Sequence, residues 1–322
     1  MTIDPDAKRD IRPFHDSLLR VLIESQNSDG GWGYHPAGQS ATEATAWALC
    51  ALQSFEGDSA ARESLARGKD WLIRNQLADG SWPVFASQTE GCWVTSLGAL
   101  ALNEFTGASD AVMRGFDWVA NSWPRTPNFF QRLRERVSRS ANVTRQDNSL
   151  SGWPWTAKTS SWVEPTAYAL ILMNRFPRER LSNLAMKRRA VAEAMLCDRM
   201  CPGGGWNSGN PMVYGVAGEA LVGPTVWALL ALQNSADRSE VRESLRWLEE
   251  KIPEICGSVS VAIAQMCLEA YGRNTASLDS QLQSVFEMDQ FLGNICVVAL
   301  AALALDRSRR LFPPAARLDA PQ

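Results

Sequence analysis

Apolar residues recur along this chain at offsets of three, four and seven positions. After Thr45, Thr166 and Thr225 the third and fourth positions hold Ala and Leu, and the seventh holds Leu or Met. This spacing places the apolar side chains on one face of an α-helix. Some runs follow the full pattern and others only part of it. Together they predict six Ala- and Leu-rich helices that begin near Thr45, Thr95, Thr166, Thr225, Val259 and Cys296.

Six amphipathic segments with charged faces alternate with these apolar runs. They cover about 14–26, 62–76, 110–122, 184–200, 238–251 and 277–291. A helix that is apolar all round needs a neighbour on every side, whereas an amphipathic helix exposes one face to water. We therefore expect the apolar helices to form an inner layer and the amphipathic helices to form an outer layer.

A glycine-containing turn that ends in Trp precedes four of the apolar runs. These turns end at Trp32, Trp82, Trp153 and Trp206, and the spacing from Trp to the following Thr is 13 residues in three cases and 19 in the fourth. A repeat of about 50 residues with a fixed internal register is typical of a helical array. The sequence thus predicts an all-α fold, an (α/α)6 toroid of six helical hairpins. An open solenoid with polar end caps is the alternative.

Two segments interrupt the repeat. The third turn is delayed, since Trp82 and Trp153 are 71 residues apart, and the excess forms a basic insertion at 123–148. A glycine-rich stretch at 207–223 lengthens the fourth turn. We expect a single toroid domain over 14–305 that contains the insertion, followed by a loose C-terminal tail over 306–322.

The composition is that of a globular protein without a strong electrostatic bias. The 322 residues carry a formal net charge of −3, which gives no support for nucleic-acid binding. Seven scattered Cys residues without zinc-type spacing favour a reducing compartment. The charged start lacks the apolar core of a signal peptide, and the run 295–305 is too short to cross a bilayer. These features predict a cytoplasmic protein.

The turns Gln26–Trp32 and Gln76–Trp82 resemble the QW repeats of squalene–hopene cyclases and oxidosqualene cyclases. The wider superfamily includes protein prenyltransferase β subunits and thioester domains, all of them α/α toroids, and the resemblance covers most of 14–305. A prenyltransferase zinc site needs a His that this chain lacks beyond His15 and His35. The Cys-Gly-Glu-Gln segment of thioester domains is absent as well. We expect neither a metal nor a cofactor.

Class II terpene cyclases are the remaining activity of this superfamily. They protonate an alkene or epoxide with the middle Asp of an Asp-x-Asp-Asp-Thr-Ala segment. Aligned on Thr-Ala, residues 162–167 place Glu164 at the position of that acid, while Trp162 and Pro165 replace its neighbours. The first repeat has a related form with Glu43. The resemblance therefore implies Glu164 and Glu43 as catalytic residues. An acid at a helix start is also stabilised by the helix dipole without any catalytic role.

Aromatic residues stand two positions after the Thr in three apolar runs, at Trp47, Tyr168 and Trp227. Glu43 and Trp47 are four residues apart, as are Glu164 and Tyr168, so each pair shares a helix face. If that face lines the barrel mouth, the rings would lie below the acids, where aromatic faces stabilise cations. We expect these rings to bind the substrate, together with Trp162. Packing between the helix layers is the alternative.

The insertion carries six Arg residues and one Glu between 125 and 145, with apolar residues among them at helical spacing. An interfacial helix would bring peripheral membrane contact through 125–145. An Arg cluster that holds a diphosphate is a second interpretation, because Arg pairs well with phosphate. A solvated charged loop is the third.

The sequence predicts a protein that handles an isoprenoid small molecule, as a class II-type terpene cyclase acting on a polyprenyl substrate. Class II cyclases of this superfamily usually enclose the substrate between two barrels, so we expect a homodimer contact or a partner chain to close the cavity. Two alternatives stay open. One is a non-catalytic lipid-binding or scaffold protein with this fold. The other is a carbohydrate-active (α/α)6 barrel with Glu43 and Glu164 as its paired carboxylates.

Overall fold

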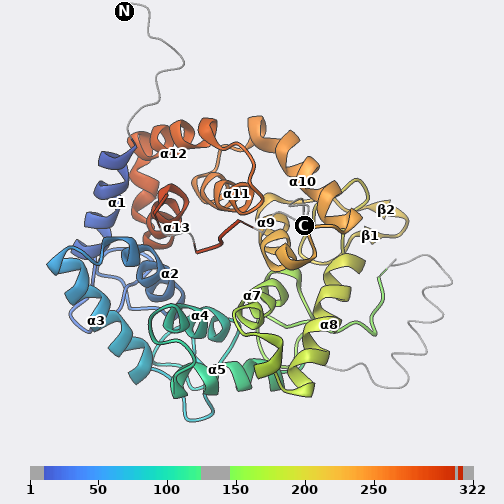
Figure 1. Cartoon of the computed structure of the whole chain (residues 1–322), viewed down its shortest axis with the longest axis horizontal. Helices are drawn as coiled ribbons and strands as arrows, with labels where there is room; N and C mark the ends of the chain where they lie inside the picture. Colours follow the sequence, from blue (N-terminus) through green and yellow to red (C-terminus); the bar gives the residue numbers. More distant parts are fainter. Residues whose placement is uncertain (1–10, 125–145, 309–310, 315–322) are drawn as a thin grey trace, which may run out of the picture.

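Two concentric rings of helices make up the molecule, which is represented here by a computed structural model (Figure 1). The structure describes residues 11–124, 146–308 and 311–314. The inner ring consists of α2 (Thr42–Leu52), α4 (Val94–Thr106), α7 (Val163–Asn174), α9 (Val222–Ala231), α11 (Ser258–Ala270) and α13 (Ile295–Leu305). The outer ring consists of α1 (Arg12–Glu24), α3 (Ser59–Arg74), α5 (Asp110–Asn121), α8 (Asn183–Asp198), α10 (Ser239–Lys251) and α12 (Ala276–Asp289). A small antiparallel hairpin, β1 (Met212–Val213) and β2 (Val216–Ala217), lies between α8 and α9 in the chain.

The inner ring is closed. Each inner helix packs against the next one along the chain, and the last, α13, packs against the first, α2 (Figure 1). The outer helix α1 also packs against α13, so the first and last hairpins share a contact. The (α/α)6 toroid is therefore confirmed, and the open solenoid is wrong, because the apolar faces of the two terminal hairpins cover each other.

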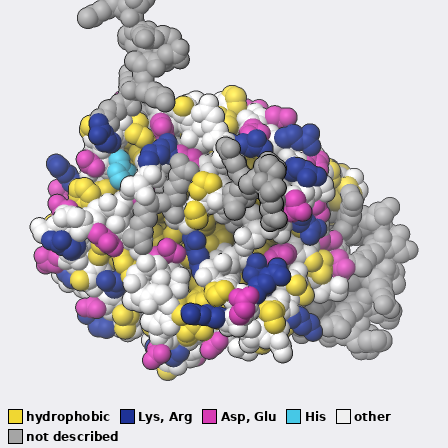
Figure 2. All heavy atoms as spheres, in the orientation of Figure 1, with side chains coloured by type: hydrophobic (Ala, Val, Ile, Leu, Met, Phe, Trp, Pro, Cys, Tyr) yellow, Lys and Arg dark blue, Asp and Glu magenta, His cyan; other side chains and the backbone are white. Residues whose placement is uncertain are grey.

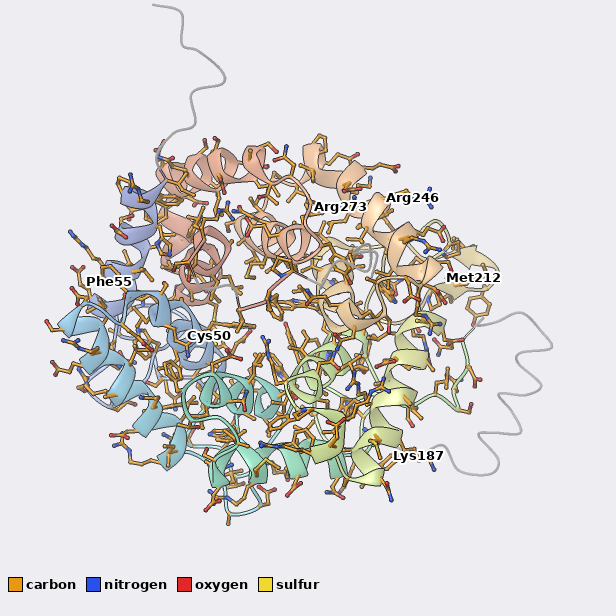
Figure 3. The ribbon with its side chains drawn as sticks, in the orientation of Figure 1. Cys50, Phe55, Lys187, Met212, Arg246 and Arg273 are labelled. Atoms are coloured by element: carbon orange, nitrogen blue, oxygen red, sulfur yellow. The ribbon has the colours of Figure 1, made fainter. Side chains whose placement is uncertain are left out.

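The two layers differ in burial as the sequence pattern predicts. Every residue of α13 is buried, whereas α10 buries only four side chains. Lys187 on α8 and Arg246 on α10 point outward from the ring (Figure 3). Apolar inner helices packed between neighbours and amphipathic outer helices facing water are the arrangement that each pattern favours.

Each turn Trp ties an inner helix to the outer helix that precedes it. The Trp backbone N–H donates a hydrogen bond of 2.8–3.0 Å to the Thr Oγ1 of the inner helix, in the pairs Trp32–Thr45, Trp82–Thr95, Trp153–Thr166 and Trp206–Thr225. The indole N–H donates at 2.6–2.8 Å to a carbonyl near the end of the outer helix, on Leu22, Leu72, Val119 and Leu196 respectively. The constant Trp–Thr register thus has a direct structural cause.

The polar residues of the first two turns are also used within the fold. Asp29 accepts hydrogen bonds from the backbone N–H of Gly31 and from the Trp71 indole, each at 3.0 Å. Trp32 packs so closely on α3 that a Cβ at Gly68 would lie 2.7 Å from its ring. The composition of these turns is therefore explained by packing and turn geometry.

Residues 311–314 lie across the end of the ring where the inner helices finish. The Arg175 guanidinium, just after α7, donates to the Leu311 carbonyl and lies 5.5 Å from the centroid of the Phe312 ring. Gln233, just after α9, donates to the Pro313 carbonyl. These four residues belong to the tail that the sequence predicts to be loose. They are instead held against the barrel, because Leu311 and Phe312 are buried there.

A buried arginine anchors the start of the insertion. The Arg188 guanidinium lies between the rings of Trp123 and Trp153, 4.1 and 3.9 Å from their centroids, and donates to the Ser122 carbonyl at 2.9 Å. Burial lowers the pKa of Arg188 to about 10. Residues 125–145 fall outside the described residues, so the membrane contact assigned to them stays a prediction.

Charges of both signs are interspersed over the face of the molecule seen in Figure 2. This mixture agrees with the small net charge of the chain. In the described ranges, no helix combines the length and the apolar character needed to cross a membrane.

Replacing Thr95 by Val should destabilise the protein by about 1–3 kcal/mol, since the buried Trp82 N–H loses its acceptor. The free energy of unfolding from urea denaturation measures the effect. Thr159→Val is the matched control, because its exposed hydroxyl bonds only to a nearby loop carbonyl, and we expect a change within about 0.5 kcal/mol. Equal effects of the two substitutions would contradict the role given to the Trp–Thr bond.

Candidate active site

Two carboxyl groups lie at the end of the barrel where the inner helices begin. Glu43 is in the first turn of α2, and Glu164 is in the first turn of α7. Helix α4 packs between these two helices in the ring. The two carboxyls are near enough for the charge of Glu43 to affect Glu164. The structure thus brings together the two acids that the sequence assigns to catalysis.

Glu43 is held by two hydrogen-bond donors. The Tyr34 hydroxyl donates to Glu43 Oε2 at 2.8 Å, and the side chain of Trp47, one turn further along α2, also hydrogen-bonds to the carboxyl. Burial raises the pKa of Glu43, and both hydrogen bonds oppose that rise because they stabilise the anion.

Glu164 differs from Glu43 in its partners. Burial raises the pKa of Glu164, and the nearby charge of Glu43 raises it further. No hydrogen bond to its carboxyl is found within the described part of the chain. Gly223, at the start of α9, lies beside this carboxyl, since a Cβ there would be in ordinary van der Waals contact with Glu164 Oε1 at 3.7 Å. Glu164 is therefore an acid with an elevated pKa that lies against the start of α9.

Three aromatic rings from different inner helices meet on the axis of the barrel. Trp47 and Trp227 stack at 5.5 Å between ring centroids, although α2 and α9 stand on opposite sides of the ring. Tyr168 contacts Trp227 at 5.0 Å. The sequence predicts that these rings bind substrate, with packing between the helix layers as the alternative. They meet across the axis at this level, because the Ala-rich inner helices approach closely enough for opposite side chains to touch.

The acids lie about one helical turn from these rings, toward the mouth of the barrel. Each Glu precedes its ring by four residues on the same helix, a rise of about 6 Å. Burial raises the pKa of the Tyr168 hydroxyl, and the charges of Glu43 and Glu164 raise it further. The mouth thus has two carboxyls above a floor of aromatic rings.

Sequence reasoning missed three aromatic residues at this end. Tyr34 bonds to Glu43, Trp93 stacks on Tyr168 at 5.4 Å, and Trp155 contacts Trp93 edge-on at 4.9 Å. The repeat register could have found Trp93, which stands two positions before the Thr, as Glu43 and Glu164 do. Tyr34 and Trp155 lie in loops outside that register.

Trp162 was expected to bind substrate with the other rings. It immediately precedes α7, and its carbonyl accepts a hydrogen bond of 2.6 Å from the Thr166 hydroxyl. No ring contact links Trp162 to the axial rings in the portion of the chain that is described. Its role in substrate binding stays a prediction.

Two thiols flank Glu43. Burial raises the pKa of Cys92 and of Cys296, and the charge of Glu43 adds to both rises, so neither is an activated nucleophile. Across residues 11–124, 146–308 and 311–314, no cluster of His, Cys, Asp and Glu has the arrangement of a metal site.

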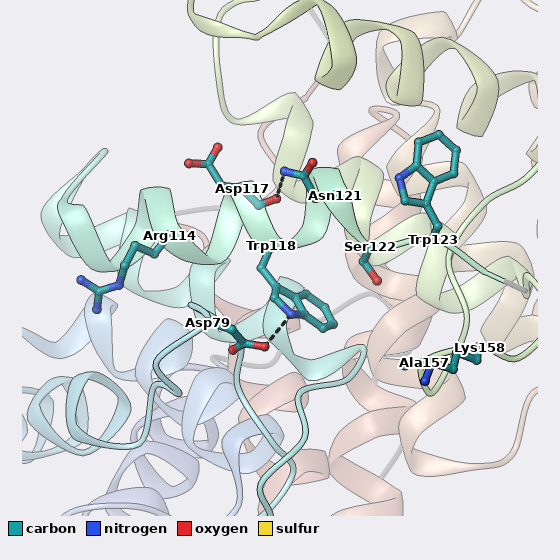
Figure 4. A pocket seen from close by; sticks show the side chains of 9 residues that line it. All are labelled: Asp79, Arg114, Asp117, Trp118, Asn121, Ser122, Trp123, Ala157 and Lys158. Carbon is teal, nitrogen blue, oxygen red and sulfur yellow. Dashed lines mark hydrogen bonds between the residues drawn. The ribbon is translucent and has the colours of Figure 1, made fainter.

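A separate cavity of about 510 Å³ lies beside α5 (Figure 4). Its lining includes Arg114, Asp117 and Lys158, so it carries charges of both signs. The carboxylate of Asp79, on the wall of this cavity, accepts a hydrogen bond of 3.1 Å from the Trp118 indole N–H. This cavity does not hold either of the acids with a raised pKa at the barrel mouth, so we place the candidate active site at the mouth.

The amino-acid sequence is similar to that of a known enzyme. No protein-family model matches the chain. It is 27% identical over 255 residues to a drimenyl diphosphate synthase of Streptomyces showdoensis, an alignment that covers 68% of this chain and 46% of that protein. The chain spans less than half the length of the curated relatives that it matches.

Solved structures agree on the architecture. The type II terpene cyclase MstE of Scytonema, in complex with its product merosterolic acid A, has a TM-score of 0.59 at 15% identity, covering 92% of this chain and 96% of that one. A glycosidase variant has a TM-score of 0.61 at 7% identity, covering 94% and 98%. Both likenesses show the fold alone, whereas the drimenyl diphosphate synthase is matched in sequence. The chain resembles the class II terpene cyclases of the α/α-toroid superfamily. The resemblance inferred from the Trp turns is thus confirmed.

Glu164→Gln should stabilise the protein, and the gain should grow as the pH rises. The raised pKa of Glu164 means that the folded state binds more protons than the unfolded state above the ordinary pKa of 4.5, so the wild type loses stability as pH rises through the folded pKa. Urea denaturation at several values between pH 4 and pH 8 measures the difference. A difference between Glu164→Gln and the wild type that stays constant with pH would contradict the burial of the Glu164 charge.

Proposed function

We propose that the chain carries out class II-type isoprenoid cyclisation at the barrel mouth, with Glu164 as the general acid. The observation that carries this proposal is a pair of carboxyls with raised pKa values one helical turn above a floor of aromatic rings. The likeness to drimenyl diphosphate synthase and to type II terpene cyclases supports the same class of chemistry.

The two acids have different parts in this proposal. The hydrogen bonds from Tyr34 and Trp47 favour the anion of Glu43. In the described part of the chain no such donor bonds to Glu164, and the charge of Glu43 opposes its ionisation. Glu43 is therefore the acid that ionises first, and Glu164 is the acid that holds its proton to the higher pH, as a general acid must.

The reaction begins when the Glu164 proton moves to the terminal alkene carbon of a prenyl chain, or to an epoxide oxygen. With the alkene, the π electrons form the new C–H bond, and with the epoxide a C–O bond breaks; in both cases a carbocation and the Glu164 carboxylate remain. Internal double bonds then attack in turn, the last cation loses a proton to water, and Glu164 takes a proton back from water. The Glu43 anion and the faces of Trp47, Tyr168 and Trp227 stabilise the positive charge.

The substrate would bind on the mouth side of the rings. Trp47 and Trp227 fill the axis below the acids, and residues 311–314 cover the opposite end. Glu164 is only partly buried, so we propose that a second copy or a partner chain covers the mouth during the reaction. Prenyl diphosphates are the first substrates to test, because the matched relative is a drimenyl diphosphate synthase.

A second candidate function is favoured by the stacked rings on the axis. This candidate is a non-catalytic lipid-binding or scaffold protein, and a scaffold needs no open cavity through the barrel. The same assays separate the two functions, since a lipid-binding protein would retain the prenyl chain unchanged. The assay also includes oligosaccharides, because a glycosidase has the same fold and a carbohydrate-active barrel is the third interpretation of the sequence.

Glu164→Gln should lower turnover of a prenyl substrate by about 100-fold or more, the usual contribution of a general acid. Cyclic products are measured by mass spectrometry after incubation with farnesyl diphosphate, geranylgeranyl diphosphate and squalene epoxide. Glu63→Gln should leave turnover unchanged. Full activity of Glu164→Gln would show that another group supplies the proton.

Trp227→Leu should lower kcat by about tenfold with little change in KM, since a cation over an aromatic face is stabilised by up to about 2 kcal/mol. We expect partly cyclised products, formed when the cation is quenched before the last ring closes, beside the normal product. Trp227→Phe keeps an aromatic face and should retain most of the rate. If Leu and Phe act alike, the ring packs the core and does not stabilise the cation.

A further inference from the structure

Tyr34 is fixed from three sides at the edge of the mouth. Its backbone carbonyl accepts a hydrogen bond of 2.9 Å from the N–H of Ile295, the first residue of α13. Its ring meets Phe85 edge-on at 6.2 Å between centroids, and its hydroxyl reaches Glu43 at 2.8 Å. The loop of the first hairpin is thereby joined to the loop of the second and to the last inner helix.

The helix that carries Glu43 is fixed as well. The Thr42 hydroxyl donates to the Pro83 carbonyl at 2.6 Å, and the Thr42 N–H donates to the Val84 carbonyl at 2.9 Å. Both the donor and the acceptor of the Tyr34–Glu43 bond therefore sit on backbone that is held by its neighbours. A hydrogen bond between two fixed groups orients the carboxyl without further loss of side-chain freedom.

The groups that face Glu43 come from five segments of the chain. Tyr34 and Trp47 donate hydrogen bonds to it, and Cys92 before α4 and Cys296 on α13 are thiols whose pKa values its charge raises. Glu164 on α7 interacts with it through charge. Among the described residues, no Lys, Arg or His side chain shifts the pKa of Glu43 by its charge. The Tyr and Trp donors are thus the groups that stabilise a negative charge at this position.

We propose that Tyr34 is a positioning residue that keeps Glu43 as the charged partner of a protonated Glu164. A catalytic effect of Tyr34 rests on the proposed function, whereas the arrangement of Tyr34, Glu43 and Glu164 does not. In this arrangement Glu43 supplies the carboxylate near the proton donor Glu164, and the Tyr34 hydroxyl holds that carboxylate by a hydrogen bond.

The experiment follows the two carboxyls directly by nuclear magnetic resonance. The full chain is labelled with ¹³C at the glutamate carboxyl carbons, and the two signals are assigned with Glu43→Gln and Glu164→Gln. In the wild type without substrate, we expect Glu43 to titrate at lower pH than Glu164. In Tyr34→Phe, the titration of Glu43 should move up by about one pH unit, since a hydrogen bond to a charged group is lost.

Tyr214→Phe is the matched control, because Tyr214 is exposed between β1 and β2 and should not alter either titration. An unchanged Glu43 titration in Tyr34→Phe, or a wild type in which Glu164 ionises first, overturns the proposal. Should Tyr34→Phe fail to fold, Glu43→Gln decides. The Glu164 titration must then move to lower pH, because the neighbouring charge is gone, and an unchanged value would overturn the proposal.

Activity separates this proposal from the proposed function. If Glu164→Gln turns over prenyl substrates at the full rate, the assigned general acid is wrong, yet the titrations still decide the role of Tyr34. If Glu164→Gln is inactive and the titrations behave as expected, Tyr34→Phe should also move the pH–rate profile, a change that loss of packing alone would not cause. A profile that keeps its position would leave Tyr34 with a structural role only and would overturn its use in catalysis.

Discussion

The hydrogen bond between a turn Trp and a helix Thr sets the geometry on which the rest of the molecule depends. In four hairpins the Trp N–H is bound by the Thr Oγ1, and the Trp indole is bound by a carbonyl of the preceding outer helix. Both groups are buried, so a lost partner would leave an unsatisfied donor. Each inner helix is thereby held at a set height against its outer helix.

Because the inner helices stand at equal heights, positions at the same distance from the Thr in different repeats lie at the same level of the barrel. Two residues before the Thr this level collects Glu43, Trp93, Glu164 and Gly223. One turn further along, Trp47 and Trp227 stack on the axis. The repeat that packs the hairpins thus also places acids over aromatic rings.

The pair of acids departs from the segment of the class II cyclases that the turns resemble. There the acids stand together on one helix, whereas Glu43 and Glu164 come from two inner helices. Separate helices place each carboxyl in its own surroundings, and Tyr34 bonds to one of them alone. Two like charges in a partly buried site oppose each other's ionisation, and the hydrogen bond from Tyr34 favours the anion of Glu43 alone.

The sequence by itself determined the six hairpins, the two layers and the identity of the two acids, because helical periodicity and the Trp–Thr spacing are local properties of the chain. Only the tertiary structure decided that Trp47 meets Trp227 across the axis, that Tyr34 reaches Glu43, and that Leu311 and Phe312 are held against the barrel. These contacts join segments far apart in the chain. They exist only because the ring closes, and no local pattern encodes how near two opposite helices will come.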